Sequence, residues 1–190
     1  MTVSNQNPSR FGIFVSILAV FWATDSRAFA QAPMSTQEKI QDAMSAAPAA
    51  IARGAAVDDW PKAGEKPPVL REGHNGWTCF PDYPASPGND PMCLDPVWMA
   101  WFDAYRKNVE PQVTSLGIAY MLQGGSAASN SDPFAAQPPD GGSWRASPPH
   151  LMIIEPDKLD PAVFDSEPSR GGPWIMWEGT PYEHLMVPAR

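Results

Sequence analysis

The sequence is poor in the residues from which metal and redox sites are most often built, with two cysteines and three histidines among 190 residues. It has no Walker loop and no Gly-x-Gly-x-x-Gly motif, which disfavours enzymes that hold a phosphate-bearing cofactor. Basic residues are also scarce, because 13 Lys and Arg stand against 21 Asp and Glu and give a formal net charge of −8. An acidic surface repels phosphates, so nucleic acid is not expected as a partner.

Long uninterrupted helical stretches are missing as well. The 23 prolines leave few stretches longer than about twelve residues intact, which disfavours a helical bundle. Glycine follows no period, so a collagen is excluded. Hydrophobic residues make up 43% of the chain, which favours a folded core over disorder.

One apolar run stands out, from Phe11 to Ala23 near the N-terminus. Arg10 supplies a positive residue before it, and Ala28-Phe29-Ala30 has the small-x-small pattern of a signal-peptidase site. The run is shorter than the about 20 residues that a membrane-spanning helix needs. We predict a signal peptide over 1–30 and a periplasmic or secreted protein with no stable membrane insertion after cleavage. An uncleaved anchor is the alternative.

Both cysteines, Cys79 and Cys93, lie in the predicted exported part of the chain. In an oxidising compartment a single pair is most simply a structural disulfide. Closing this proline-rich loop is worth about 3 kcal/mol on the chain-entropy model. A metal site and a redox pair are the alternatives, and the latter usually has the closer C-x-x-C spacing.

Two helices have clear start signals. Ser35-Thr36-Gln37-Glu38 is a capping box that predicts a helix from Thr36 to about Ala46. Asp95-Pro96 predicts the start of a second helix, Val97 to about Lys107, which is apolar almost all round.

Short apolar runs bounded by Gly or Pro predict strands in the rest of the chain. A hairpin is expected over Val69–Phe80, with Asn75-Gly76 in its turn, and a weaker strand pattern covers Ala49–Val57. Four later strands are expected at Gly117–Leu122, His150–Ile154, Trp174–Trp177 and Tyr182–Val187, with a turn at 178–181 joining the last two.

The resulting fold prediction is a loop-rich α+β protein with one disulfide, two helices and a mostly antiparallel sheet of five to seven short strands. Residues 31–60 are assigned to an N-terminal helix and connector. Residues 61–190 are assigned to a single globular domain with a long loop at 123–149. A loop of that length without secondary structure is unusual, which makes it a candidate functional loop.

Three stretches carry a resemblance: Asn75 to Asp82 (NGWTCFPD), Gly171 to Trp177 (GGPWIMW) and Gly179 to His184 (GTPYEH). They resemble segments of an uncharacterised family of secreted bacterial proteins. The resemblance implies a bacterial exported protein. That family has no established activity, so no functional residue is carried over.

The tripeptide His-Leu-Met occurs twice, at 150–152 and at 184–186. Residues i and i+2 of a strand share a face, so each repeat presents an imidazole and a thioether on the same side. These ligands suit Cu(I), which makes His150, Met152, His184 and Met186 a candidate soft-metal site. The alternative is that the methionines fill an irregular core. No other cofactor is expected.

The chain is rich in tryptophan, and aromatic side chains beside polar groups bind sugars, apolar ligands or cations. The predicted ligand region lies between the long loop and the last two strands. Its candidate residues are Trp144, His150, Trp174, Tyr182 and His184. The alternative is that these aromatic residues strengthen a small core.

The leading hypothesis is an exported binding or interaction module without catalysis of its own. A soft-metal protein is the second hypothesis, and a hydrolase of unknown substrate is the third. Ser126 with His150 and an acid would form a triad, but no G-x-S-x-G motif is present. The sequence leaves the partner, any catalytic residue and the question of enzyme activity open.

Overall fold

The computed structural model describes residues 1–2, 34–62, 64–167 and 171–189. The chain divides into two units, Met1–Ala32 and Pro33–Arg190. The predicted signal peptide therefore lies almost wholly outside the described residues, and the elements below all belong to the second unit. Within the described part of the chain, no helix has the length and apolar character needed to cross a membrane.

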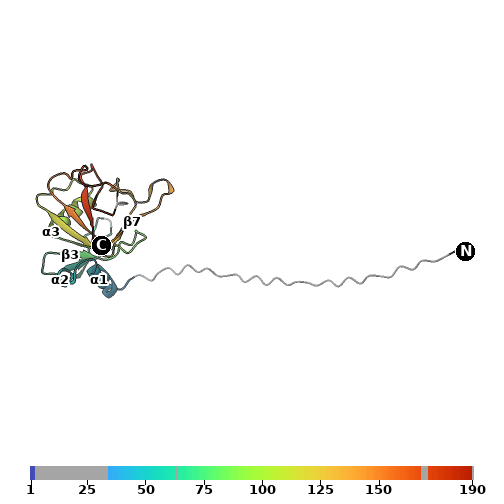
Figure 1. The fold of residues 1–190 in the computed structure, drawn as a ribbon. Helices are drawn as coiled ribbons and strands as arrows, with labels where there is room; N and C mark the ends of the chain where they lie inside the picture. Colours follow the sequence, from blue (N-terminus) through green and yellow to red (C-terminus); the bar gives the residue numbers. More distant parts are fainter. Residues whose placement is uncertain (3–33, 63, 168–170, 190) are drawn as a thin grey trace. The chain divides into compact units, whose positions relative to one another are not determined.

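The fold is α+β, with a mostly antiparallel sheet (Figure 1). The helices are α1 (Thr36–Ser45), α2 (Ala49–Ala52), α3 (Pro96–Arg106) and the short 3-10 helix η1 (Pro139–Gly141). The main sheet has the strand order β2-β1-β3-β4-β5-β8-β10-β9. Its strands are β1 (Ala56–Asp58), β2 (Val69–Arg71), β3 (Thr78–Phe80), β4 (Met92–Leu94), β5 (Gly117–Met121), β8 (His150–Ile154), β9 (Trp174–Met176) and β10 (His184–Pro188).

The predicted number of elements was too low, because the main sheet has eight strands rather than five to seven and the described chain has three α-helices rather than two. Strand β4 was missed because its three residues are too few to show alternation. The long loop 123–149 also contains structure, since β6 (Gly125–Ala127) pairs with β7 (Arg145–Ser147) in a separate two-stranded sheet.

The predicted hairpin over Val69–Phe80 was wrong in its pairing. Its two strands form, but β1 lies between them, antiparallel to β2 and parallel to β3. The turn instead packs against the chain that leads into β1, so closely that a Cβ on Gly73 would collide with the backbone nitrogen of Ala56. The Ala56 N–H donates to the carbonyl of Trp77 at 2.8 Å. The weak strand pattern at 49–57 is helix α2 followed by β1.

Both predicted helix starts are confirmed. The Ser35 hydroxyl accepts from the Glu38 N–H and the Glu38 side chain accepts from the Ser35 N–H, so the capping box is complete. The Asp95 carboxylate accepts from the Trp98 N–H at 2.8 Å and from the Ile118 N–H at 2.6 Å. Asp95 therefore caps α3 and also ties its start to strand β5.

The Cys79–Cys93 disulfide is confirmed and joins directly opposite residues of β3 and β4. Both cysteines are fully buried. They pack with alanines of α1 and α2 on one face of the sheet. The bridge therefore fixes the proline-rich loop between β3 and β4 at its base.

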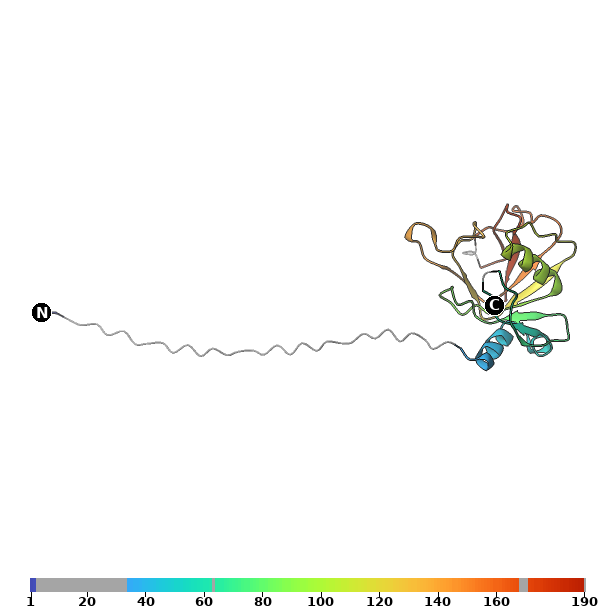
Figure 2. The ribbon, with the colours of Figure 1, turned by 180° about the vertical axis from the view of Figure 1, so that it is seen from behind.

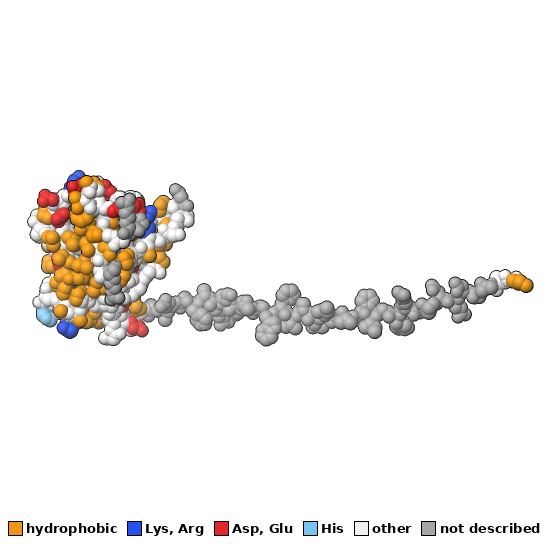
Figure 3. All heavy atoms as spheres, in the orientation of Figure 1, with side chains coloured by type: hydrophobic (Ala, Val, Ile, Leu, Met, Phe, Trp, Pro, Cys, Tyr) orange, Lys and Arg blue, Asp and Glu red, His pale blue; other side chains and the backbone are white. Residues whose placement is uncertain are grey.

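The main core lies on the other face of the sheet, beneath α3 (Figure 2). It is built from large side chains of α3 and of the late strands, including Trp98, Trp101, Met152, Trp174 and Met186. On the opposite face, α1 and α2 pack over β1, β3 and β4, whereas apolar side chains on β5 and β8 are only half-buried. Hydrophobic side chains gather on the side of the molecule seen in Figure 3.

Candidate functional site

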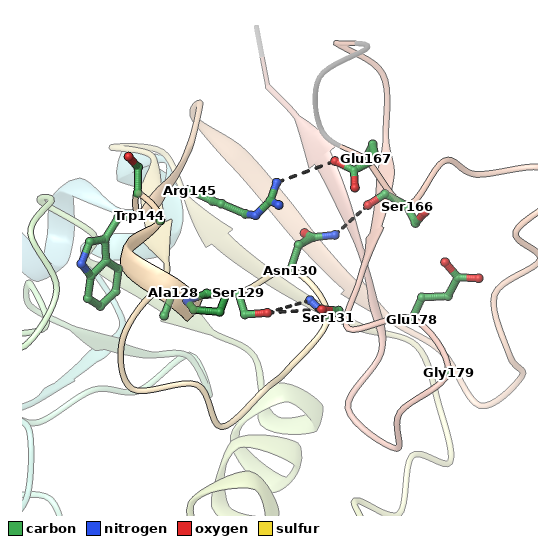
Figure 4. A pocket seen from close by; sticks show the side chains of 13 residues that line it. Ala128, Ser129, Asn130, Ser131, Trp144, Arg145, Ser166, Glu167, Glu178 and Gly179 are labelled. Carbon is green, nitrogen blue, oxygen red and sulfur yellow. Dashed lines mark hydrogen bonds and ion pairs between the residues drawn. The ribbon is translucent and has the colours of Figure 1, made fainter.

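A groove with a volume of about 640 Å³ lies between the long loop and the segments that flank β9. Loop residues 128–131 and 142–145 line it on one side, and residues 166–167 and 178–179 line it on the other (Figure 4). The sequence predicted a ligand region between the long loop and the last two strands. The groove occupies that region.

Asn130 joins the two sides of the groove. Its side-chain amide donates to the Ser166 carbonyl at 2.6 Å, and its backbone carbonyl accepts from the Trp177 N–H at 2.8 Å. Trp177 adds a second link, because its indole N–H donates to the Ser129 carbonyl at 3.1 Å. These bonds anchor the long loop to the end of β9, so the groove has a fixed wall rather than a free flap.

The rest of the groove lining is polar and nearly balanced in charge. Arg145 and Glu167 form an ion pair at 3.7 Å, with both side chains about half exposed. Glu178 adds one more carboxylate, and serine residues add hydroxyl groups. Such a lining offers both hydrogen-bond donors and acceptors to a ligand.

Among the described lining residues, Trp144 is the one with an aromatic side chain, and it is half-buried. Figure 4 shows Trp144 and Arg145 extending in opposite directions from the start of β7. Among the five predicted ligand residues, Trp144 alone contributes to the groove.

The other four predicted ligand residues lie in the protein interior. Their exposed fractions are 1% for His150, 1% for Trp174, 5% for Tyr182 and 2% for His184. The Tyr182 hydroxyl donates to the Val109 carbonyl at 3.0 Å. The expectation that these side chains line one open aromatic groove is therefore corrected: burial under α3 and the late loops keeps them from that surface.

His184 lies among tryptophan rings. Its ring centroid is 5.3 Å from that of Trp98, 5.7 Å from that of Trp101 and 5.1 Å from that of Trp177, all edge to face. Burial lowers the pKa of His184 to about 4. His184 and Trp101 also line a second cavity of about 250 Å³, whose other residues include four carboxylates and Lys158.

His150 has a different environment. Its Nδ1 lies 2.6 Å from the Pro148 carbonyl oxygen, much as the His184 Nδ1 lies 3.0 Å from the Tyr182 carbonyl oxygen, but the His150 Nε2 is buried without a hydrogen-bond partner. A carbonyl oxygen only accepts, so Nδ1 carries the proton and Nε2 has a bare lone pair. Burial lowers the pKa of His150 below its usual value, which keeps the ring neutral at neutral pH.

The two His-Leu-Met repeats lie on neighbouring antiparallel strands, and their methionines meet. Met152 of β8 is directly opposite Met186 of β10. His150 is opposite Pro188, and the register places His184 opposite Ile154. The two histidines thus flank the methionine pair, separated by about 13 Å along the strands.

A pair of neighbouring carboxylates, Asp82 and Asp90, was not predicted from the sequence. The Asp82 carboxylate accepts from the Asp90 N–H at 3.0 Å. Burial, followed by the side chain and charge of Asp90, raises the pKa of Asp82 to about 6. Asp82 and Asp90 stand at the two ends of a proline-rich loop, where a sequence shows no periodicity that would bring them together.

The arrangement of Ser126 does not favour the triad considered from the sequence. Its hydroxyl donates to Asp90 at 3.1 Å, while His150 Nε2 has no hydrogen-bond partner. A nucleophilic serine needs its hydroxyl bonded to the base. The hydrolase hypothesis therefore stays a prediction without an assigned nucleophile.

Across the described ranges, no group of three or more His, Cys, Asp or Glu side chains is placed to hold a metal ion. That finding does not bear on methionine ligands. Comparisons with protein-family models, with curated proteins and with solved structures found no significant match. The resemblance to secreted bacterial proteins accordingly stays a prediction, and the functional argument depends on the site itself.

Proposed function

We propose that this protein is a non-catalytic binding module that acts in the periplasm or outside the cell and holds a saccharide-like ligand in the groove of Figure 4. The observation that carries the proposal is the groove itself, an open cavity of about 640 Å³ lined by hydroxyl, amide and charged groups, with Trp144 at its edge (Figure 4). Ligand sites typically combine an apolar contact surface with a few well-placed polar groups.

The chemistry of the lining favours a neutral, hydroxyl-rich ligand. Arg145, the one cation among the described lining residues, already pairs with Glu167, so this part of the lining does not select an anionic ligand. Ser129, Ser131 and Ser143 line the same space and can donate to and accept from ligand hydroxyls. Trp144 offers an amphipathic ring on which the apolar face of a sugar can pack.

Binding to an array of immobilised glycans tests the ligand class. We expect binding to at least one glycan, and Trp144→Ala to weaken it by more than about tenfold, as for a central aromatic contact. Phe134→Leu is the matched control, because Phe134 is an exposed aromatic residue of the same loop that does not line the groove. The proposal is overturned if no glycan binds, or if Trp144→Ala binds as tightly as the wild type.

The location is tested separately. N-terminal sequencing of the protein isolated from cells should give a chain that begins at Gln31, because the predicted cleavage follows Ala30. The disulfide between two buried cysteines supports a location in an oxidising compartment. Recovery of the chain with residues 1–30 still attached, in the cytoplasmic fraction, would contradict export without affecting the ligand test.

A further inference from the structure

Three buried residues, His150, Met152 and Met186, carry side chains of the kinds that bind soft metals and lie near one another in the sheet. Met152 and Met186 are directly opposite on β8 and β10, so their Cα atoms are about 5 Å apart. His150 is two residues before Met152 on the same face, about 7 Å away along the strand. Residues at these spacings can direct their side chains to one point above the sheet.

The imidazole of His150 has the tautomer and the hydrogen bond that are typical of a metal-binding histidine. Metal-binding histidines usually donate their other ring N–H to a carbonyl or carboxylate, which fixes the tautomer and the ring orientation. The 2.6 Å contact between His150 Nδ1 and the Pro148 carbonyl has this form. It leaves Nε2 as a buried lone pair without a partner, on a side chain that is 1% exposed.

A buried polar atom without a partner lowers the stability of the fold, so a ligand that binds this nitrogen would remove that cost. We propose that His150 Nε2 and the thioether sulfurs of Met152 and Met186 together bind one Cu(I) ion. Thioethers are soft ligands and select Cu(I) among the common metals, and imidazole is compatible with it. This inference is independent of the saccharide groove, which lies among other residues.

Trp174 supports the choice of a cation. It is directly opposite Met186 on β9, so it continues the row from Met152 across three strands. Its ring centroid is 6.3 Å from that of His150. An indole face close to a bound cation adds a favourable electrostatic contact, and the effect is strongest where water is excluded.

The structure narrows the sequence prediction from four ligands to three. His184 lies on the other side of the methionine pair, where three indole rings surround it edge to face. Met176 is its direct neighbour across β9 and β10. His184 and Met176 therefore provide matched controls, a second buried His and a second buried Met on the same face.

The test is a competition for Cu(I) against bicinchoninate, without oxygen, on purified full-length protein and its variants. We expect one equivalent of Cu(I) to transfer to the wild type over a long incubation, since all three ligands are buried. Met152→Leu, Met186→Leu and His150→Gln should each weaken binding by more than about tenfold, whereas Met176→Leu and His184→Gln should not. Leucine keeps the side-chain volume, so the core stays packed.

X-ray absorption of the loaded protein supplies the second measurement. We expect one nitrogen and two sulfur scatterers around copper. The proposal is overturned if the wild type takes no Cu(I) from the competitor, or if His184→Gln or Met176→Leu loses as much binding as His150→Gln. Circular dichroism of each variant shows whether a loss comes from unfolding, and a His150→Gln variant that is folded and still binds Cu(I) would also overturn it.

Discussion

The tripeptide His-Leu-Met occurs on two neighbouring strands, but its two histidines have different surroundings. Because β8 and β10 are antiparallel, the methionines meet in the middle and the histidines lie at opposite ends. At one end, α3 and Trp177 enclose His184 in indole rings. At the other end, His150 faces Trp174, with Nε2 unpaired.

The two histidines differ in surroundings because different segments of the chain pack onto the two ends of β8 and β10. Helix α3 brings Trp98 and Trp101 to the His184 end. Near the His150 end, a Cβ on Gly125 would lie 3.6 Å from the His150 ring and 3.8 Å from Asp90, so a carboxylate is close by. A repeated tripeptide therefore specifies a shared backbone geometry, while distant elements decide the chemistry of each histidine.

Removing the aromatic enclosure is expected to have the largest effect. Trp101 is 4% exposed, so Trp101→Ala should lower the free energy of unfolding by about 4 kcal/mol. Water would then reach His184, and its pKa should rise toward the value of a solvated histidine. Denaturant unfolding and NMR titration of the histidine rings measure the two effects. An equal rise in the pKa of His150 would show that the two ends are not independent.

The pH dependence of stability next separates the two buried histidines from exposed His74. Burial lowers the pKa of His184 from 6.5 to about 4, so the unfolded chain takes up a proton first as the pH falls. His184 therefore leaves the free energy of unfolding unchanged above pH 6.5. Between pH 6.5 and pH 4 it lowers that free energy by about 3 kcal/mol.

His184→Gln should flatten the unfolding profile in that window, as measured by denaturant unfolding at each pH. His150→Gln should flatten it too, because the pKa of His150 is also lowered by burial. Exposed His74 is the control, and a His74→Gln variant with the same flattening would contradict the assignment.

The carboxylates of Asp82 and Asp90 give the smallest expected effect. The pKa of Asp82 is raised from 3.8 to about 6, so the folded protein holds this proton more tightly and its ionisation costs stability as the pH rises through 6. Asp82→Asn should raise the free energy of unfolding at pH 7 by about 1 kcal/mol, after allowance for solvent screening at this partly exposed site. The gain should vanish below pH 3.8. A loss of stability at pH 7 would mean that the carboxylate charge is favourable.

The sequence predicted helices and strands correctly where they depend on interactions between residues close together in the chain. The Ser35 capping box, the Asp95 cap and the short apolar run at 150–154 each act within a few residues, and each is confirmed. The insertion of β1 between β2 and β3 depends on contacts between segments far apart along the chain. No local pattern encodes that pairing, and the Asn75-Gly76 turn signal suggested a different one.

The candidate sites follow the same rule. The length and composition of the loop suggested a ligand region beside it, and Trp144 does line the groove found there, but ligand binding at that place stays a prediction. Asn130, Arg145 and Glu178 were missed, because polar loop residues look alike until the chain folds. Strand geometry placed His150 with Met152 and His184 with Met186, but the meeting of the methionines and the separation of the histidines depended on the register between β8 and β10.

The position of β1 has a consequence for the order in which the molecule assembles. β1 precedes β2 and β3 in the chain, yet it lies between them in the sheet and pairs with both. During synthesis, β1 can therefore pair with β2 first, but it joins the rest of the sheet only when β3 has emerged, and such non-local pairing slows folding. A shortened chain that lacks α1 to β1 would leave β2 without a partner and β3 as an open edge, which favours aggregation.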